Sequence, residues 1–196
     1  MRRLGPWRQY GGEGEMSLGG YATLLGAWAA IFGSAGAALV RRRAIPRLGG
    51  SDIVLLGLAT HKLTRIVTKD WVTAPLRAPF TAYLGSAGSG EVHEKSRGSG
   101  VRRALGDLLT CNYCTGPWVA GALLVGWGFA TRVTRAFASL FAVVAVSDFL
   151  HEIYEAFRAR RSADTAAEAF GSAAADEVRA RKARELGDSE RAAHMS

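Results

Sequence analysis

The chain has 196 residues, enough for one domain with a core, and it carries a formal net charge of +8. Residues 1–150 contain 17 Lys/Arg and 8 Asp/Glu, whereas residues 151–196 contain 8 and 9, so the positive excess lies among the apolar stretches. Lys and Arg beside apolar stretches are typical of membrane proteins. No basic stripe is interleaved with aromatic residues, and we therefore expect no nucleic-acid partner.

The first apolar run is LGGYATLLGAWAAIFGSAGAALV, residues 18–40, which contains no charged residue. At about 1.5 Å per residue a helix of this length crosses a hydrocarbon core of roughly 30 Å. Ala35–Ala37 would fit the small-residue site of a cleaved signal peptide. However, the run is longer than a typical apolar core of about 7–15 residues, and Glu13 and Glu15 interrupt the basic segment before it. The run predicts a transmembrane helix.

Residues 1–17 form an N-terminal segment whose translation is open to question. The stretch GGEGEM at 11–16 suggests that its codons contain a purine-rich ribosome-binding site. Met16 is then an alternative start, and it would remove three arginines that bear on membrane orientation: Arg2, Arg3 and Arg8.

A basic connector, residues 41–52, leads to a second candidate membrane helix at 53–69. Ser51 or Asp52 is a suitable N-cap for this helix. Residues 53–59 are apolar on all sides, and the basic residues that follow share one helical face: Lys62, Arg65 and Lys69. The segment either spans steeply or lies partly in the interface, so we expect three or four hydrophobic helices.

Residues 70–116 are expected to form a polar loop, broken by Pro and rich in Gly and Ser. A short amphipathic helix is predicted within it at VRRALGDLL, residues 101–109. No long β-type run occurs in the chain. The sequence therefore predicts an all-α fold.

Two further apolar stretches, 117–131 and 136–152, are predicted to form an antiparallel helical hairpin that begins at Pro117. Small residues would let its backbones approach closely in lipid: Gly121, Ala122, Gly126 and Gly128. The tail, residues 153–196, is rich in Ala and charge and is expected to be a frayed surface helix or disordered.

Three stretches resemble one family when they are taken together: LATHKLTRIVTKDWVTAPLRAPF, RGSGVRRALGDLLTCNYCTGPW and VSDFLH. The family is the bacterial membrane-protein family known as domain of unknown function 1360, which includes a sporulation-associated protein. The resemblance covers about residues 53–152 and implies a multi-pass membrane protein with no established activity. Its main features are Leu63–Arg65, Asp70, Arg77, the Cys111/Cys114 pair and Trp118.

Cys111 and Cys114 form a C-x-x-C pair for which three interpretations stay open. A structural zinc site normally has four ligands, and His93 from the same loop would supply only a third. A redox pair is favoured by a helix N-terminus, which lowers a thiol pKa, but the strand–helix pattern of a thioredoxin-like fold is missing. The third interpretation is structural packing or a disulfide.

Asp148 lies near the end of an apolar stretch, and an ionisable group inside a span is a candidate functional site. Arg65 or His61 is its candidate partner, although Asp148 close to His151 would also suit the membrane interface. No nucleophile, base and orienting group occur together in the pattern, so we expect no enzyme.

These observations predict a small bacterial multi-pass protein of the inner membrane with a structural or interaction role. The expected partners are the lipid bilayer and a second copy or another membrane protein, with no cofactor. The alternative is a membrane-bound thiol-redox or zinc protein. The positive-inside rule is best satisfied with the loop 70–116 and the tail in the cytoplasm, which predicts free or metal-bound thiols at Cys111 and Cys114.

Overall fold

The computed structural model describes residues 18–88 and 90–194. The expectations for residues 1–17, including a start at Met16, lie outside this part of the chain. Two compact units are present, one ending at Val146 and the other covering Ser147–Ser196. They are taken separately below.

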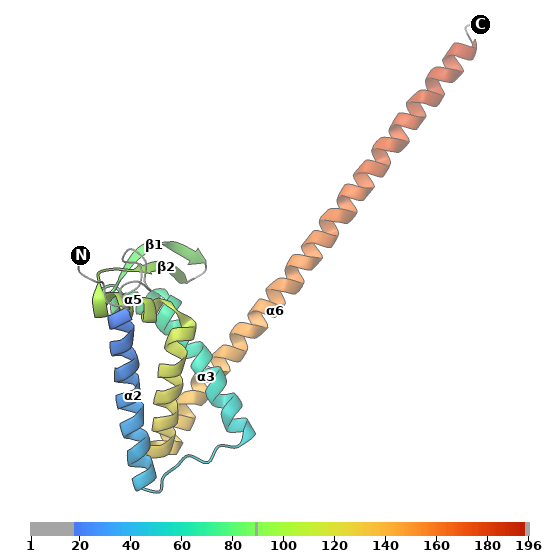
Figure 1. The fold of residues 1–196 in the computed structure, drawn as a ribbon. Coiled ribbons are helices and arrows are strands. Elements are labelled where there is room, and N and C mark those ends of the chain that lie inside the picture. The colour runs from blue at the N-terminus through green and yellow to red at the C-terminus, as the bar shows by residue number, and fades with distance from the viewer. Residues whose placement is uncertain (1–17, 89, 195–196) are drawn as a thin grey trace, which may run out of the picture. The chain divides into compact units, whose positions relative to one another are not determined.

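The described chain is mostly helical, as expected, but it is not all-α. Its elements in order are α2 (Leu18–Arg41), α3 (Gly50–Lys69), η1 (Trp71–Thr73), α4 (Ala74–Arg77), β1 (Thr81–Gly88), β2 (Glu91–Ser96), α5 (Gly100–Thr110) and α6 (Asn112–His194). The expected polar loop is therefore wrong in part, because it folds into short helices and an antiparallel hairpin. We call residues 70–111 the cap. Figure 1 shows the hairpin and α5 gathered at one end of the helices of the first unit.

Two helices in the described residues are long and apolar enough to cross a membrane: α2 and the part of α6 from Asn112 to Ala167. The helix predicted at 18–40 matches α2 almost residue for residue. The helix α3 falls outside this pair because its second half is basic. Three or four spans therefore stay a prediction.

The N-cap residue of α3 is neither Ser51 nor Asp52, the two residues that the sequence analysis predicts. Gly49 is the N-cap residue, with an extended backbone, and Asp52 is the third residue after it. Asp52 Oδ2 accepts a hydrogen bond from the Gly49 N–H at 3.0 Å. Asp52 therefore stabilises the first turn from inside the helix, where a carboxylate also complements the helix dipole.

The predicted helical hairpin is present, with different limits. The backbone of α6 is non-helical at Ala130 (φ −147°, ψ 62°), and this single corner replaces the expected link at 132–135. A Cβ placed on Gly126 would lie 2.9 Å from Thr134 Oγ1, so the two segments touch beside the corner. The first segment begins at Asn112 rather than at Pro117. Its first turn is closed by the Thr115 N–H, which donates to the Cys111 carbonyl at 3.0 Å.

The core of the first unit joins α3 to both segments of α6. Leu56 and Ala59 of α3 are buried against Leu123, Trp127 and Ala138 of α6. Two of the five residues are alanines, whose small side chains let the helix backbones approach closely.

Glycines of α6 also bring α2 into this bundle, which the sequence did not indicate. A Cβ on Gly121 would lie 2.7 Å from the Phe32 ring, and one on Gly128 would lie 2.6 Å from Leu39 Cδ2. The sequence analysis places both glycines in the α6 hairpin. The atoms nearest to a Cβ at Gly121 or Gly128 belong to α2, whereas those nearest to a Cβ at Gly126 belong to the second segment of α6. In Figure 1 α2 runs beside the first segment of α6.

The second unit is the remainder of α6, helical to His194. Large apolar side chains on it are exposed, including Ile153, Tyr154 and Phe157. Arg158 forms an ion pair with Glu155 one turn earlier at 3.9 Å. This segment matches the expected surface helix.

The hairpin of the cap is shaped by its glycines and held by one apolar anchor. The register runs from Thr81 opposite Ser96 to Gly88 opposite Glu91. Gly88 (φ 137°) and Gly90 (φ 79°) supply the positive φ angles at which the chain reverses. Val92 on β2 is only 2% exposed.

The helix α5 holds the hairpin against α2 through two glycine contacts. A Cβ on Gly106 would lie 2.5 Å from the Phe80 carbonyl oxygen, and one on Gly20 of α2 would lie 2.6 Å from the Gly100 carbonyl oxygen. Both contacts require a residue without a side chain, so the cap sits directly on the helix ends.

Candidate functional site

Arg77 is the most deeply buried charged residue that the structure describes, with 0% exposure. Its Nε donates to Glu94 Oε2 at 2.7 Å, so the charge is paired within the cap. Its Nη1 donates to the Val67 carbonyl at 2.8 Å, and its Nη2 donates to the Asp70 carbonyl at 3.0 Å. These carbonyls are at the C-terminal end of α3, where the helix dipole favours a cation. One guanidinium thus joins α3 to the hairpin.

Arg65 makes a second, more open link between α3 and the hairpin. Its Nη2 lies 2.6 Å from Glu91 Oε1, with side-chain exposures of 36% and 23%. Arg65 meets this carboxylate of the cap because β2 passes beside the second half of α3.

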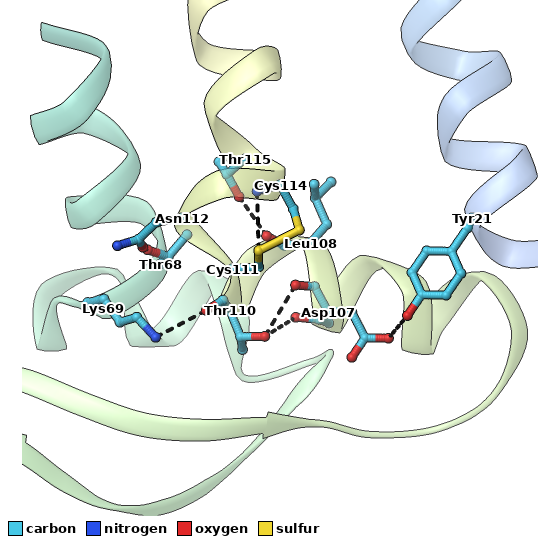
Figure 2. The surroundings of a disulfide bond; sticks show 11 residues. Tyr21, Thr68, Lys69, Asp107, Leu108, Thr110, Cys111, Asn112, Cys114 and Thr115 are labelled. Atoms are coloured by element: carbon cyan, nitrogen blue, oxygen red, sulfur yellow. Dashed lines mark hydrogen bonds between the residues drawn. A yellow bond between two sulfur atoms is a disulfide. The ribbon is translucent and has the colours of Figure 1, made fainter. Parts of the chain in front are cut away.

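Residues at the end of α3 also hold the junction between α5 and α6 (Figure 2). Lys69 Nζ donates to the Thr110 carbonyl at 3.1 Å. Thr68, which is buried, donates its hydroxyl to the Thr64 carbonyl at 2.8 Å and contacts Asn112 Oδ1. The junction that carries the cysteines is therefore fixed by direct hydrogen bonds to α3.

Cys111 and Cys114 are joined by a disulfide in the structure. Cys111 ends α5 with an extended backbone (φ −110°, ψ 110°), and α6 starts at the next residue. This arrangement places the two Cα atoms 5.2 Å apart, within the usual disulfide range of about 4.4–6.8 Å. The Cys114 N–H also donates to Cys111 Sγ at 3.2 Å. The prediction of free or metal-bound thiols is wrong for this structure, because the extended backbone of Cys111 brings the two cysteines within bonding range.

The zinc alternative receives no support. His93 lies exposed on β2, opposite Gly85. Across residues 18–88 and 90–194, no group of three His, Cys, Asp or Glu side chains is placed to hold a metal ion. The sulfurs of Cys111 and Cys114 are bonded to each other, so neither is offered as a thiolate ligand.

Asp107 on α5 organises the side of the cap that faces α2. One of its oxygens accepts a hydrogen bond from the Tyr21 hydroxyl and the other from the Ser96 hydroxyl. Figure 2 shows Tyr21 reaching from α2 toward Asp107. Each carboxylate oxygen thus has a hydroxyl partner, which offsets the cost of removing the charge from water.

An apolar groove of about 660 Å³ lies between α2, α5 and the start of α6. Its apolar lining includes Leu24, Leu25, Trp28, Leu108, Pro117 and Trp118. Tyr21 and Asp107 close one side, and both cysteines contribute to the wall. The indole Nε1 of Trp28 donates to the Pro117 carbonyl at 3.3 Å, which fixes that ring in the wall.

The candidate pair of Arg65 and Asp148 stays a prediction. Arg65 belongs to the first unit and binds Glu91, whereas Asp148 belongs to the second unit. The acids that pair with the basic residues of the cap were missed by the sequence analysis: Glu91 and Glu94. Glu91 and Glu94 are three positions apart on β2, which in a regular strand puts them on opposite faces, so no one-face pattern in the sequence marks them as a pair.

One family model and two relatives match this chain. A family model described as "Protein of unknown function (DUF1360)" matches residues 55–154, which include most of α3 and the whole cap. The sporulation protein YjcA of Bacillus subtilis (strain 168) is 40% identical over 81 residues, covering 40% of this chain and 69% of that protein. The UPF0713 protein YngL of the same organism is 31% identical over 88 residues, covering 44% of this chain and 65% of that protein.

No solved structure matches the chain. The family match extends over half of the sequence, and its limits enclose Arg65, Arg77 and the cysteine pair. The chain therefore belongs to the family described as protein of unknown function DUF1360.

Proposed function

We propose that the chain is a multi-pass protein of the bacterial inner membrane with a structural or interaction role, in which apolar helices carry a rigid cap. The observation that carries the proposal is the burial of Arg77, which ties the cap to α3 through Glu94 and two helix-end carbonyls. A cap held in this way presents a fixed surface rather than a moving loop.

The surface of the cap supports an interaction role. Several large apolar side chains on η1, α4 and β1 are exposed: Trp71, Val72, Leu76, Tyr83 and Leu84. The rings of Trp71 and Tyr83 lie 5.7 Å apart, which joins η1 to β1 in one patch. Exposed apolar patches of this kind mark contacts with proteins or with the membrane surface.

Membrane extraction tests the location. We expect the full chain to stay in the membrane fraction after washing at alkaline pH and to be released by detergent, because α2 and α6 carry long apolar segments. Release by the alkaline wash alone would contradict an integral membrane protein.

Photo-crosslinking in intact cells tests the interaction role. A photo-reactive residue at Leu76, a 72% exposed apolar position of α4, should give a defined protein adduct, either with a second copy or with another membrane protein. The same residue at Lys95, on the exposed side of β2, is the matched control and should give none. Equal labelling at both positions, or adducts only with lipid at Leu76, would contradict a protein contact at this patch.

Orientation in the membrane is a separate proposal. The disulfide favours a cap on the outer side of the membrane, whereas the sequence analysis places it in the cytoplasm. If all four helices span, residues 41–50 and 132–135 lie on one side of the membrane and together contain six Lys/Arg. Residues 69–116 lie on the other side and also contain six, so the positive-inside rule does not choose between the two orientations. Disulfides persist on the oxidising side of a membrane. We therefore propose that the cap faces outward and the connector faces the cytoplasm.

Labelling of single cysteines tests this orientation. In a variant with both native cysteines replaced, a membrane-impermeant maleimide should label Ser86→Cys on the hairpin in intact cells. Arg47→Cys in the connector should react only after permeabilisation. The reverse pattern would restore the cytoplasmic cap.

A further inference from the structure

Beyond the first unit, α6 carries an apolar stripe that is open to its surroundings. The stripe consists of Leu150, Ile153, Tyr154 and Phe157, whose exposed fractions lie between 52% and 64%. Spacings of three and four residues place these side chains on one side of the helix over about two turns. Removing four large apolar side chains from water is favourable, so this face is a candidate contact surface.

The charged residues of the same segment are sorted around the stripe. At about 100° per residue, Arg158 and Arg160 lie roughly 90° and 70° from its centre, one on each side. Arg161 follows Phe157 along the stripe and ends it. Three acids lie on the opposite side of the helix, roughly 150–170° from the centre of the stripe: Asp148, Glu152 and Glu155. The apolar face is therefore bordered by positive charge, and the negative charge lies away from it.

The arginines lie close to the aromatic rings of the stripe. Arg158 and Arg161 line one surface hollow together with Tyr154 and Phe157. Arg158 also forms the ion pair with Glu155 at 3.9 Å, but the two side chains are 69% and 64% exposed. An exposed ion pair is weak, so an anion brought to the stripe can compete for this guanidinium.

The length of the stripe argues against a second copy of the chain as its partner. A coiled coil needs apolar positions that continue over at least three or four heptads. Here the stripe ends after two turns, and the next residues on the same face are Arg161 and Asp164. A lipid surface fits better, because apolar side chains enter the acyl boundary while the bordering arginines reach the phosphates.

We propose that residues 147–161 lie along the surface of a membrane that contains anionic phospholipid. The apolar stripe then enters the boundary of the acyl chains, the arginines meet the phosphates, and the acids face water. The placement rests on the proposed membrane location. The apolar part of α6 that is long enough to cross a membrane belongs to the same continuous helix, so a bilayer is the nearest surface for this segment.

Spin labels on two adjacent residues test the placement in the full chain. Ile153→Cys lies on the stripe and Glu152→Cys on the opposite side of the helix, about 1.5 Å apart along its axis. Each is made in the variant without native cysteines, checked by thermal unfolding, labelled with a nitroxide and placed in phosphatidylglycerol vesicles. We expect the Ile153→Cys label to be accessible to oxygen, which concentrates in lipid, and protected from a water-soluble nickel complex. The Glu152→Cys label should show the reverse.

Three other patterns of labelling would overturn the proposal. Access of the nickel complex to both labels means that the segment stands free in water. Protection of both from the nickel complex, with access to oxygen, means that it lies deeper, as part of a span. Protection of the Ile153→Cys label from both reagents, with spin–spin broadening, means that a second copy covers the stripe.

The arginines are tested by comparing phosphatidylglycerol with phosphatidylcholine vesicles. We expect the ratio of lipid-exposed to water-exposed Ile153→Cys label to be higher in phosphatidylglycerol. Arg160→Gln with Arg161→Gln should lower that ratio roughly fivefold for each arginine lost. Arg179→Gln with Lys182→Gln removes two charges from exposed positions farther along α6 and is the matched control. It should change the ratio by less than about twofold, because charges beyond a Debye length of roughly 10 Å are screened.

Equal ratios in the two lipids, or equal losses for the two double variants, would refute the role of the bordering arginines. A chain that stays in the membrane after alkaline washing but gives any of these contrary results refutes only the surface placement of residues 147–161. Release by the wash refutes the membrane location on which that placement rests.

Discussion

The cap and the apolar helices beneath it are held together by opposite kinds of contact. In the cap, Arg77 is fully buried and every contact described for its guanidinium goes to an oxygen of Glu94, Thr73 or the α3 backbone. Between the helices, Ala59 and Ala138 are fully buried, and Gly121 receives the ring of Phe32. One region depends on pairing charges and the other on removing side chains.

The two kinds of contact make the two regions sensitive to different substitutions. A buried ion pair is sensitive to the loss of either partner, because the remaining charge cannot reach water. Close helix packing depends on small side chains and is sensitive to added volume. The following variants test that distinction, from the largest expected effect to the smallest.

Replacing Arg77 with Met should have the largest effect. The change leaves Glu94 buried with 6% side-chain exposure and without its cation. Loss of one partner of a buried pair costs about 3–5 kcal/mol of the free energy of unfolding. Thermal and denaturant unfolding in detergent would measure this cost.

A double variant separates the stranded charge from the lost packing. Arg77→Met with Glu94→Leu should recover part of the loss, because two apolar side chains can replace an ion pair. A single variant as stable as the wild type would show that the cap does not depend on this charge.

Adding volume at Gly121 should be the next largest effect. A Cβ there would lie 2.7 Å from the Phe32 ring, so Gly121→Leu forces α2 away from α6. Overpacking of this kind costs about 1–3 kcal/mol, measured as a lower unfolding temperature in detergent. Gly33→Leu on α2, where a Cβ meets nothing within 4 Å, is the control and should be close to neutral. Equal losses for both variants would argue against the contact.

The sequence predicted the helices better than the cap for a physical reason. Membrane-like segments are recognised from local composition, and the limits of α2 were predicted almost correctly from 18–40. The hairpin β1–β2 depends on partners distant in sequence, such as Arg65 with Glu91, and Gly and Ser in its strands obscured the β pattern. Gly121 was recognised as a packing residue, but composition does not tell which helix it meets.

The candidate site shows the same limit. Cys111 and Cys114 were correctly singled out, because their spacing is local. Their oxidation state was inferred from a predicted topology and was wrong, since the extended backbone of Cys111 brings the Cα atoms to 5.2 Å. The contact of Asp107 with Tyr21 of α2 could not be predicted, because it spans 86 positions of the chain.

Removing the disulfide should have an intermediate effect. Cys111→Ser with Cys114→Ser opens a ring of only four residues, for which the chain-entropy relation gives about 2 kcal/mol. We expect a lower unfolding temperature, matched by adding a reductant to the wild type and unaffected by reductant in the variant. Alkylation and mass analysis without reductant would establish the state of the native pair. A reductant effect that persists in the double variant would contradict this assignment.

Arg65→Gln should have the smallest effect and sharpens the comparison with Arg77. Both arginines join α3 to a glutamate of β2, but Arg65 and Glu91 are 36% and 23% exposed, so water can solvate either charge alone. Pairs of this kind contribute about 0–1 kcal/mol, and added salt weakens them further. Unfolding of Arg65→Gln at low and high salt should therefore differ from the wild type by less than about 1 kcal/mol and converge as salt rises. A loss as large as that of Arg77→Met, insensitive to salt, would mean that burial does not separate the two pairs. The ion pairs of the cap would then act as one network that fails when either member is removed.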